Sequence, residues 1–126
     1  MNNYLLSNAG YAVATYLLAI GDRHLENLML RDNGSMFHLD FGFILGNNPT
    51  EKTLWNSPIR INIPMVLGMG GLKHQNYQKF KSLTIDAFLY LRNCKNLILN
   101  MLTIMVDSSI PDLRRDDYQN ILEKMN

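Results

Sequence analysis

The sequence of 126 residues lacks most of the features that mark a secreted or membrane-spanning protein. Cys94 is the only cysteine, so no disulfide can form within the chain, which is typical of a protein from a reducing compartment. The apolar run over residues 12–20 is too short to span a bilayer, and Asp22 and Arg23 follow it. The first residues also lack the charged segment and apolar core of a secretory signal.

An excess of charge of one sign is also lacking. Twelve Lys and Arg residues against eleven Asp and Glu residues leave a formal net charge of +1. A nucleic-acid-binding chain normally carries a strong basic excess, so we expect no nucleic acid partner. There is no internal repeat or low-complexity tract. An apolar content of 47% allows a buried core, and the length fits one domain or part of one.

Residues 21–42 carry the clearest signs of chemistry. Asp22, His24 and Asn27 lie close together in the sequence, and Asp40 follows after a short apolar segment. Phosphoryl transfer requires a carboxylate or imidazole beside the attacking hydroxyl, and an Asn and an Asp that converge on a magnesium ion at the phosphates. This single stretch contains all of these groups.

The intervening residues predict a β-hairpin that brings the two ends of this stretch together. Residues 28–31 and 36–39 have the pattern of short strands, and residues 32–35 include an Asn-Gly pair that favours a tight turn. Asn27 enters the first strand and Asp40 leaves the second, so both are expected at the same edge. One amide oxygen and one carboxylate suit a hard cation such as Mg²⁺.

Asp22-Arg23-His24-x-x-Asn27, followed by Asp40-Phe41-Gly42, resembles the catalytic and magnesium-binding loops of the phosphatidylinositol 3-/4-kinase family. Ordinary protein kinases place the His before Arg-Asp instead. Further segments resemble class III phosphatidylinositol 3-kinase, the vacuolar protein sorting lipid kinase: residues 77–80, 87–92, 96–100, 105–107 and 110–113. The resemblance runs from about Gly10 to Leu113. It implies a mainly α fold with a small β-hairpin, which is the C-terminal lobe of a protein-kinase-like catalytic domain.

Asp22 and His24 compete for the role of general base. Asp22 has the spacing to Asn27 of the catalytic Asp in protein kinases, whereas histidine side chains titrate close to neutral pH. The resemblance favours His24 beside the attacking hydroxyl and the γ-phosphate, with Asp22 orienting it or sharing the proton. Arg23 is expected to anchor the loop through a carboxylate.

The resemblance also implies ATP as the phosphate donor and Mg²⁺, with Mn²⁺ as an alternative, held by Asn27 and Asp40. The remaining nucleotide-binding residues that it implies are Met29, Leu39, Asp40, Phe41 and Gly42, with Met29 and Leu39 as the apolar floor under the adenine ring. From the pattern alone, Met29 and Leu39 would be core residues. For His38, the resemblance suggests a structural hydrogen bond near the loops.

An activation loop is expected over residues 43–61, where the family meets the lipid headgroup. Lys52 and Arg60 are the candidate headgroup contacts, with plain solvent exposure as the alternative for each. Glu51 neighbours Lys52, and so few cations favour unphosphorylated phosphatidylinositol over a polyphosphorylated lipid. The proline-rich activation loop common in class III enzymes is reduced here to Pro49 and Pro58, which weakens that inference.

Five helices are predicted around these loops. The ranges are 5–20, 63–69, 77–93, 97–106 and 116–125. Gly21 permits the turn from the first helix into the catalytic loop, 21–27. The metal-binding loop is 40–42, and the C-lobe helices occupy 63–125. Residues 97–106 are apolar nearly all round, which indicates a helix buried in a larger body.

We therefore expect an ATP-dependent kinase that phosphorylates the 3-hydroxyl of phosphatidylinositol to give phosphatidylinositol 3-phosphate, in endosomal trafficking and autophagy. Phosphatidylinositol in membranes and regulatory protein subunits are the implied partners. The implied location is cytoplasmic, at the surface of endosomal or autophagic membranes. The alternatives are a phosphatidylinositol 4-kinase or related Ser/Thr kinase, and a non-catalytic truncated interaction module. Because no phosphate-covering loop or pairing Lys precedes Gly21, we expect little or no activity from these residues alone.

Overall fold

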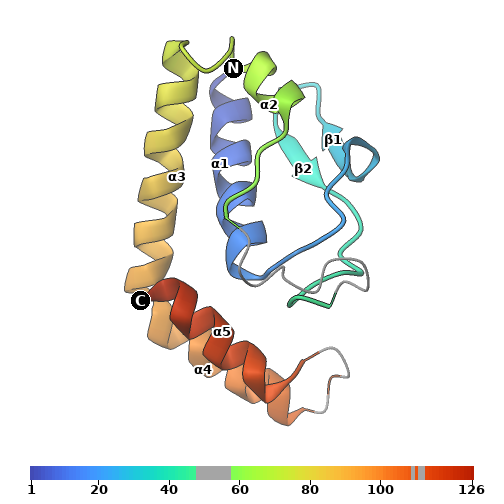
Figure 1. Cartoon of the computed structure of the whole chain (residues 1–126), viewed down its shortest axis with the longest axis vertical. Helices are drawn as coiled ribbons and strands as arrows, with labels where there is room; N and C mark the ends of the chain where they lie inside the picture. Colours follow the sequence, from blue (N-terminus) through green and yellow to red (C-terminus); the bar gives the residue numbers. More distant parts are fainter. Residues whose placement is uncertain (48–57, 109, 111–112) are drawn as a thin grey trace.

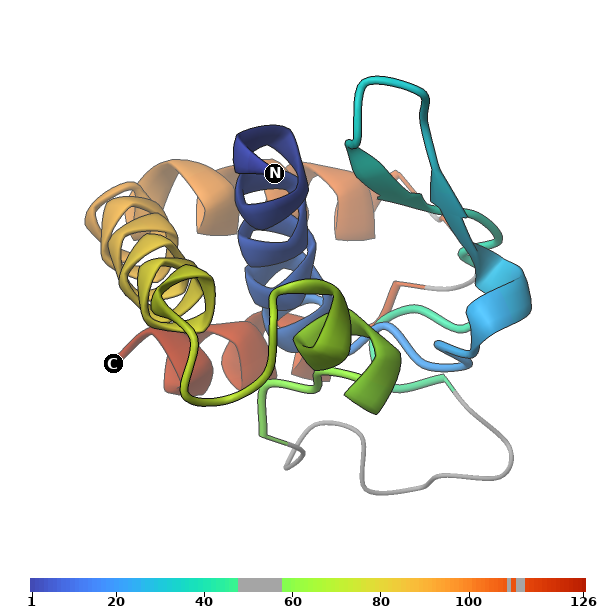
Figure 2. The same cartoon turned by 90° about the horizontal axis from the view of Figure 1, so that it is seen from above.

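The computed structural model describes residues 1–47, 58–108, 110 and 113–126. It is mainly helical and contains one small antiparallel sheet of two strands, which confirms the predicted fold class. The central element is α1 (Asn2–Leu17), which lies between α3 (Gln75–Asn93) and the hairpin in both views (Figures 1 and 2). None of the helices in the described part is long and apolar enough to cross a membrane.

Helix α1 contributes to both apolar clusters found among the described residues. The upper cluster joins it to α3 and to the end of α2 (Ile63–Gly68). The lower cluster joins it to α4 (Lys95–Asp107) and α5 (Arg115–Met125), which pack together at the other end (Figure 1). The buried members are Leu5, Ala9, Ala12, Met69 and Phe80 above, and Val13, Leu17, Leu45, Leu99, Leu102, Ile121 and Met125 below.

The buried face of α1 differs by one residue from the predicted one. In the sequence, Leu6, Ala9, Val13 and Leu17 recur at spacings of three and four, which predicts that they share the buried face, but Leu6 is exposed and Leu5 is buried instead. Leu5 lies one turn before Ala9 and therefore points to the same side of the helix. The pattern identified the helix correctly but not which of two adjacent leucines faces α3.

Helix α4 is partly buried within this chain. Leu99 and Leu102 are buried, whereas Leu97, Met101 and Ile104 are exposed. In the described part of the chain, α4 packs mainly against α5 and the end of α3. One face is covered within this chain and the other is not, so burial of this helix in a larger body stays a prediction.

Helix α1 also ends three residues before the predicted boundary. Ala19 adopts a left-handed conformation with φ of 44°, and the N–H of Ile20 donates to the carbonyl of Thr15 at 3.0 Å. The N–H of Ala19 donates to Tyr16 at 3.4 Å. This pair of bonds forms a Schellman-type helix end, in which a residue with positive φ closes the last turn. The apolar spacing continued past Leu17, but the backbone did not.

Ala19 and Asp22, on either side of Gly21, have positive φ values, whereas Gly21 does not. The turn out of α1 therefore places its backbone strain on these two residues and not on the glycine. Asp22 has φ of 53°, a region that Asp and Asn enter more readily than most residues. Backbone bonds then join this turn to the residues that follow Gly42: Gly21 N to Phe43 O at 2.8 Å, Leu45 N to Leu18 O at 2.8 Å, and Gly46 N to Ala19 O at 3.2 Å.

The hairpin forms as predicted. A short 3₁₀ turn, η1 (Leu25–Asn27), leads into β1 (Leu28–Leu30), which pairs with β2 (Met36–His38). Gly34 has φ of 84° in the turn, which is a conformation that glycine adopts at little cost. The hydroxyl of Ser7 accepts a hydrogen bond from the N–H of Met36 at 2.9 Å and so ties the hairpin to α1.

Candidate active site

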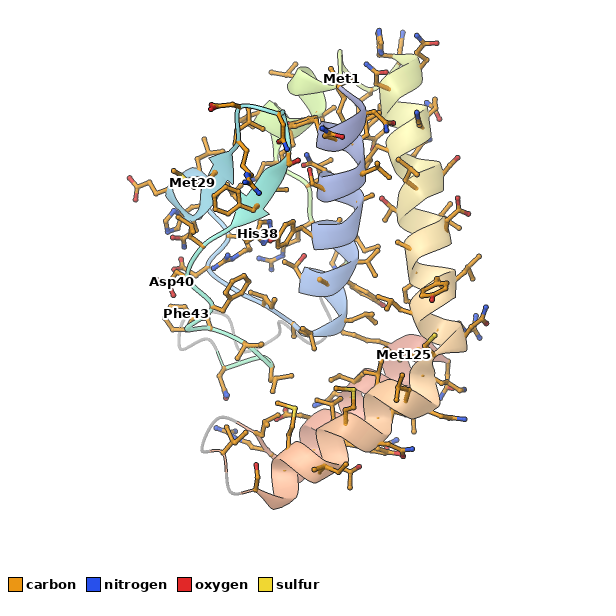
Figure 3. The ribbon with its side chains drawn as sticks, turned by 180° about the vertical axis from the view of Figure 1, so that it is seen from behind. Met1, Met29, His38, Asp40, Phe43 and Met125 are labelled. Carbon is orange, nitrogen blue, oxygen red and sulfur yellow. The ribbon has the colours of Figure 1, made fainter. Side chains whose placement is uncertain are left out.

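The hairpin brings Asn27 and Asp40 to the same edge, as the sequence predicted. The N–H of Leu39 donates to the carbonyl of Asn27 at 2.8 Å, which extends the ladder by one residue beyond β1 and β2. Asp40 is the next residue and leaves the sheet at the end nearest the catalytic loop (Figure 3). The two candidate metal ligands are therefore neighbours across the strand ends.

Asp22, His24 and Asn27 form one hydrogen-bonded cluster. The Nδ2 of Asn27 donates to the Asp22 carbonyl at 2.7 Å and lies 3.3 Å from its Oδ2. The same amide nitrogen is 3.2 Å from Nε2 of His24, and Nε2 is 3.5 Å from Oδ1 of Asp22. The side chains of His24 and Asp22 are 48% and 37% exposed, so a substrate hydroxyl can reach them. The structure brings the predicted base candidates together with the metal-ligand candidate.

Arg23 anchors the catalytic loop through backbone carbonyls, not through a carboxylate as the sequence predicted. Its Nε donates to the carbonyl of Gly21 at 2.8 Å, and its terminal nitrogens donate to Leu39 at 2.7 Å and to Asp40. The guanidinium also lies 5.5 Å from the centre of the Phe41 ring. Arg23 thus joins the start of the catalytic loop to the metal-binding loop, since its donors reach both.

Asp40 and Gly42 form a compact turn. Asp40 has φ of 53°, and its Oδ1 accepts a hydrogen bond from the N–H of Gly42 at 3.0 Å. A Cβ at Gly42 would lie 3.2 Å from this oxygen, which is tighter than ordinary contact. An amide oxygen on Asn27 and a carboxylate on Asp40 are hard oxygen donors that fit Mg²⁺. No group of three or more His, Cys, Asp or Glu side chains in the described part could form a metal site.

Met29 and Leu39 lie on the face of the hairpin that points away from α1. Met29 pairs with Phe37 across the hairpin, and Leu39 follows Phe37 by two residues along the chain. The three side chains therefore share one face. Met29 and Leu39 are both exposed, so the core interpretation of these residues is wrong. Figure 3 shows Met29 on the outer side and His38 towards α1. An exposed apolar pair beside Asp40 is compatible with the predicted floor under an adenine ring.

Comparison with known proteins agrees with this geometry. The family model described as phosphatidylinositol 3- and 4-kinase matches residues 1–115. The chain belongs to the phosphatidylinositol 3- and 4-kinase family. The predicted family resemblance is therefore confirmed.

Three relatives illustrate the similarity. "Phosphatidylinositol 3-kinase pik3" of Schizosaccharomyces pombe is 48% identical over 116 residues, which cover 92% of this chain and 14% of the relative. "Phosphatidylinositol 3-kinase VPS34" of Arabidopsis thaliana is 45% identical over 123 residues, or 98% of this chain and 15% of the relative. "Phosphatidylinositol 3-kinase catalytic subunit type 3" of Caenorhabditis elegans is 42% identical over 123 residues, or 98% and 13%. The chain thus spans a small part of the length of these kinases.

His38 supports the loops of this family member by stacking rather than by the predicted hydrogen bond. Its ring lies 4.3 Å from the ring of Tyr11 in α1. Its Nδ1 is buried and has no hydrogen-bond partner within the described residues. Burial, with a smaller effect of the nearby Arg23 charge, lowers the pKa of His38 to about 4. The imidazole is therefore neutral at physiological pH.

We expect His38 to make the fold sensitive to acid. Its pKa is about 4 in the fold against 6.5 in the unfolded chain. Between these values only the unfolded state binds the proton, so stability is retained above pH 6.5 and lost as the pH falls towards 4. His38→Phe keeps the stack on Tyr11 and removes the titration. Urea denaturation at neutral and acid pH gives the free energy of unfolding that each chain loses in acid. The parent should lose on the order of 2 kcal/mol more than His38→Phe. An equal loss in both chains would contradict this role of His38.

Lys124 is a contact to the loop region that sequence reasoning missed. Its Nζ donates to the backbone carbonyl of Tyr16 and lies 4.4 Å from the centre of the Tyr16 ring. Burial lowers the pKa of Lys124 to about 8. Tyr16 is in the last turn of α1, which leads through a tight turn to the catalytic loop, so α5 contacts the helix end that carries this loop. The two residues are 108 positions apart, and no local pattern signals their contact.

Arg60, a candidate headgroup contact, is exposed and borders a cavity of about 140 Å³ behind the catalytic loop. Arg23, His38 and Lys124 also line this cavity. The second candidate, Lys52, lies outside the described residues. The structure therefore places Arg60 near the loop, and its contact with a lipid stays a prediction.

Proposed function

We propose that this chain supplies the catalytic and metal-binding loops of an ATP- and Mg²⁺-dependent kinase. The proposed reaction transfers the γ-phosphate to the 3-hydroxyl of phosphatidylinositol and gives phosphatidylinositol 3-phosphate. The observation that carries the proposal is the cluster of Asp22, His24 and Asn27, joined across the hairpin end to Asp40. The three relatives described above are all named phosphatidylinositol 3-kinases, which supports the choice of lipid and position.

In this proposal His24 removes the proton from the attacking hydroxyl. Oδ1 of Asp22 lies 3.5 Å from Nε2 of His24, so its negative charge stabilises the imidazolium that forms. The hydroxyl oxygen then bonds to the γ-phosphorus as the bond to ADP breaks. The Asn27 side-chain amide donates to the carbonyl of Asp22 and so fixes the backbone that carries this carboxylate.

Asn27 and Asp40 are the residues that would hold Mg²⁺. When bound, this ion neutralises the negative charge of the phosphates during transfer. Arg23 keeps the two loops in register because it donates to carbonyls in both. Met29 and Leu39 would contact the adenine ring, and Phe41 and Gly42 would complete the nucleotide site.

The setting that we propose is a cytoplasmic enzyme at the surface of endosomal or autophagic membranes, where phosphatidylinositol resides. Arg60 and Lys52 would contact the headgroup, and regulatory protein subunits would join the complete enzyme. These points follow from the family resemblance, and the cavity that Arg60 and Arg23 both line supports a place for Arg60 near the catalytic loop.

The test is a chimera in which this chain replaces the matching segment of the Schizosaccharomyces pombe relative, since the chain spans 14% of that protein. The chimera is incubated with Mg-ATP and vesicles that contain phosphatidylinositol or its 4-phosphate, and the product isomer is identified. We expect phosphatidylinositol 3-phosphate from the unphosphorylated lipid. The isolated 126-residue chain should give little or no product.

Other outcomes of this assay would contradict the proposal. A 4-phosphate product would indicate a phosphatidylinositol 4-kinase, which the matched family model also includes. Phosphorylation of a Ser/Thr peptide, offered in a parallel incubation in place of the vesicles, would indicate a Ser/Thr kinase. A folded chimera that binds ATP and gives no product would favour a non-catalytic interaction module.

A further inference from the structure

An exposed apolar surface lies on α2 and the turn that follows it, at the opposite end of the molecule from α4 (Figure 1). Ile63, Leu67 and Leu72 are 75%, 67% and 62% exposed. An open groove of about 510 Å³ runs between them and is lined almost entirely by apolar residues and glycine: Ile61, Ile63, Val66, Leu67, Gly70, Gly71, Leu72 and Lys73. We call Ile63, Leu67, Leu72 and Lys73 the α2 patch.

The side of α2 opposite the α2 patch packs against the rest of the molecule and fixes the position of the helix. Met69, at the end of α2, is fully buried against α1 and α3. The Tyr4 hydroxyl donates to the carbonyl of Met65 at 3.4 Å. Gly70 has φ of 97°, and a Cβ there would lie 2.7 Å from the ring of His74, so the turn requires glycine. The exposed leucines are therefore presented by an anchored turn.

The charge of the chain segment that carries the patch has one sign. Residues 58–85 contain Arg60, Lys73, Lys79 and Lys81 and no Asp or Glu, although the whole chain is nearly neutral at +1. Lys73 lines the groove itself. Bulky aliphatic side chains in a segment whose only charged residues are cations match an anionic lipid surface, where the apolar residues enter the acyl boundary and the lysines meet headgroup charge. The described part of the chain has no helix that could cross the membrane, so the fit is to the interface.

We propose that the α2 patch docks on an anionic lipid surface. This inference deepens the proposed function, because it rests on a substrate that lies in such a surface. It assigns to α2 the task of holding the catalytic loop close to the lipid. Leu67 and Ile63 would enter the acyl boundary, and Lys73 would contact anionic headgroups.

The experiment measures sedimentation of the 126-residue chain with vesicles, without ATP and without phosphatidylinositol. We expect binding to vesicles of phosphatidylcholine with phosphatidylserine, weaker binding in high salt, and little binding to phosphatidylcholine alone. Leu67→Glu should weaken binding at least about tenfold, because the variant no longer buries a leucine side chain in the acyl boundary of the vesicle. Lys73→Gln should weaken binding to the anionic vesicles only.

The matched control is Leu97→Glu on α4, since Leu97 is 64% exposed against 67% for Leu67. It should bind as the parent does, and thermal unfolding confirms that each variant is folded. Unchanged binding of Leu67→Glu, or an equal loss in Leu97→Glu, would overturn the proposal. The proposal would also be overturned if the chain did not bind vesicles but formed a dimer that Leu67→Glu disrupts. The patch would then be a protein interface.

This experiment is separable from the test of the proposed function. Vesicle binding requires no catalysis, and the chimera can be assayed on phosphatidylinositol dispersed in detergent, where no membrane docking is needed. Product formation in detergent together with absent vesicle binding would refute the docking surface alone. Vesicle binding with no kinase product would refute the kinase proposal and leave the docking surface intact.

Discussion

Replacement of Asp40 by Asn in the chimera is expected to lower kcat at least about 100-fold, since even residues that only support a metal ligand account for 10–100-fold. The asparagine amide oxygen can still accept from the N–H of Gly42, and asparagine tolerates the φ of 53° at this position. The loop is therefore expected to keep its shape, while the charge that attracts Mg²⁺ is lost. Initial rates measured over a range of Mg²⁺ concentrations should show a raised Mg²⁺ requirement.

Asp32→Asn is the matched control for this change. Asp32 is exposed in the hairpin turn, close in sequence to Asp40, and belongs to neither loop. Its rate should equal that of the parent chimera. If Asp40→Asn keeps a rate within a few-fold of the parent at low Mg²⁺, Asp40 is not the metal ligand.

His24→Gln is expected to lower kcat by about 100-fold to 10,000-fold, which is the usual contribution of a general base. Asp22→Asn should have a smaller effect, because it removes the charge 3.5 Å from Nε2 but leaves the imidazole in place. Initial rates of the parent chimera and of each variant, measured at saturating Mg-ATP, check both expectations.

His74→Gln makes the same chemical change away from the loops. His74 caps α3 by accepting from the N–H of Asn76 at 3.1 Å, so this variant should lose some stability but retain kcat. A larger loss in Asp22→Asn than in His24→Gln would assign the base to Asp22. If both variants stay within tenfold of the parent, neither side chain is the base.

Much of the site was predictable because its parts are close in sequence. The Asn-Gly turn specifies a hairpin, and a hairpin necessarily places Asn27 beside the residues that leave its second strand. The grouping of Asp22, His24 and Asn27 follows in the same way from their spacing along one loop. Met29 and Leu39 share a face because side chains alternate along a strand.

Other features required the folded chain. Arg23 was expected to find a carboxylate, but the turn around Ala19 and Asp22 directs it to three carbonyls in two loops. His38 stacks on Tyr11 because β2 packs against α1, a contact that neither strand nor helix pattern contains. Whether the leucines of α2 and α4 are exposed also depends on which elements pack beside them, and the composition of a helix does not show this.

The sequence by itself determined the elements and the chemistry of the site, since turn residues, apolar periodicity and the spacing of Asp22, His24, Asn27 and Asp40 act over short distances along the chain. Tertiary packing decided how that site is supported. Lys124 reaches Tyr16 across 108 positions, and α3 covers Leu5 rather than Leu6. Such contacts depend on the relative placement of whole helices, which is set by how their apolar faces fit together and not by any local pattern.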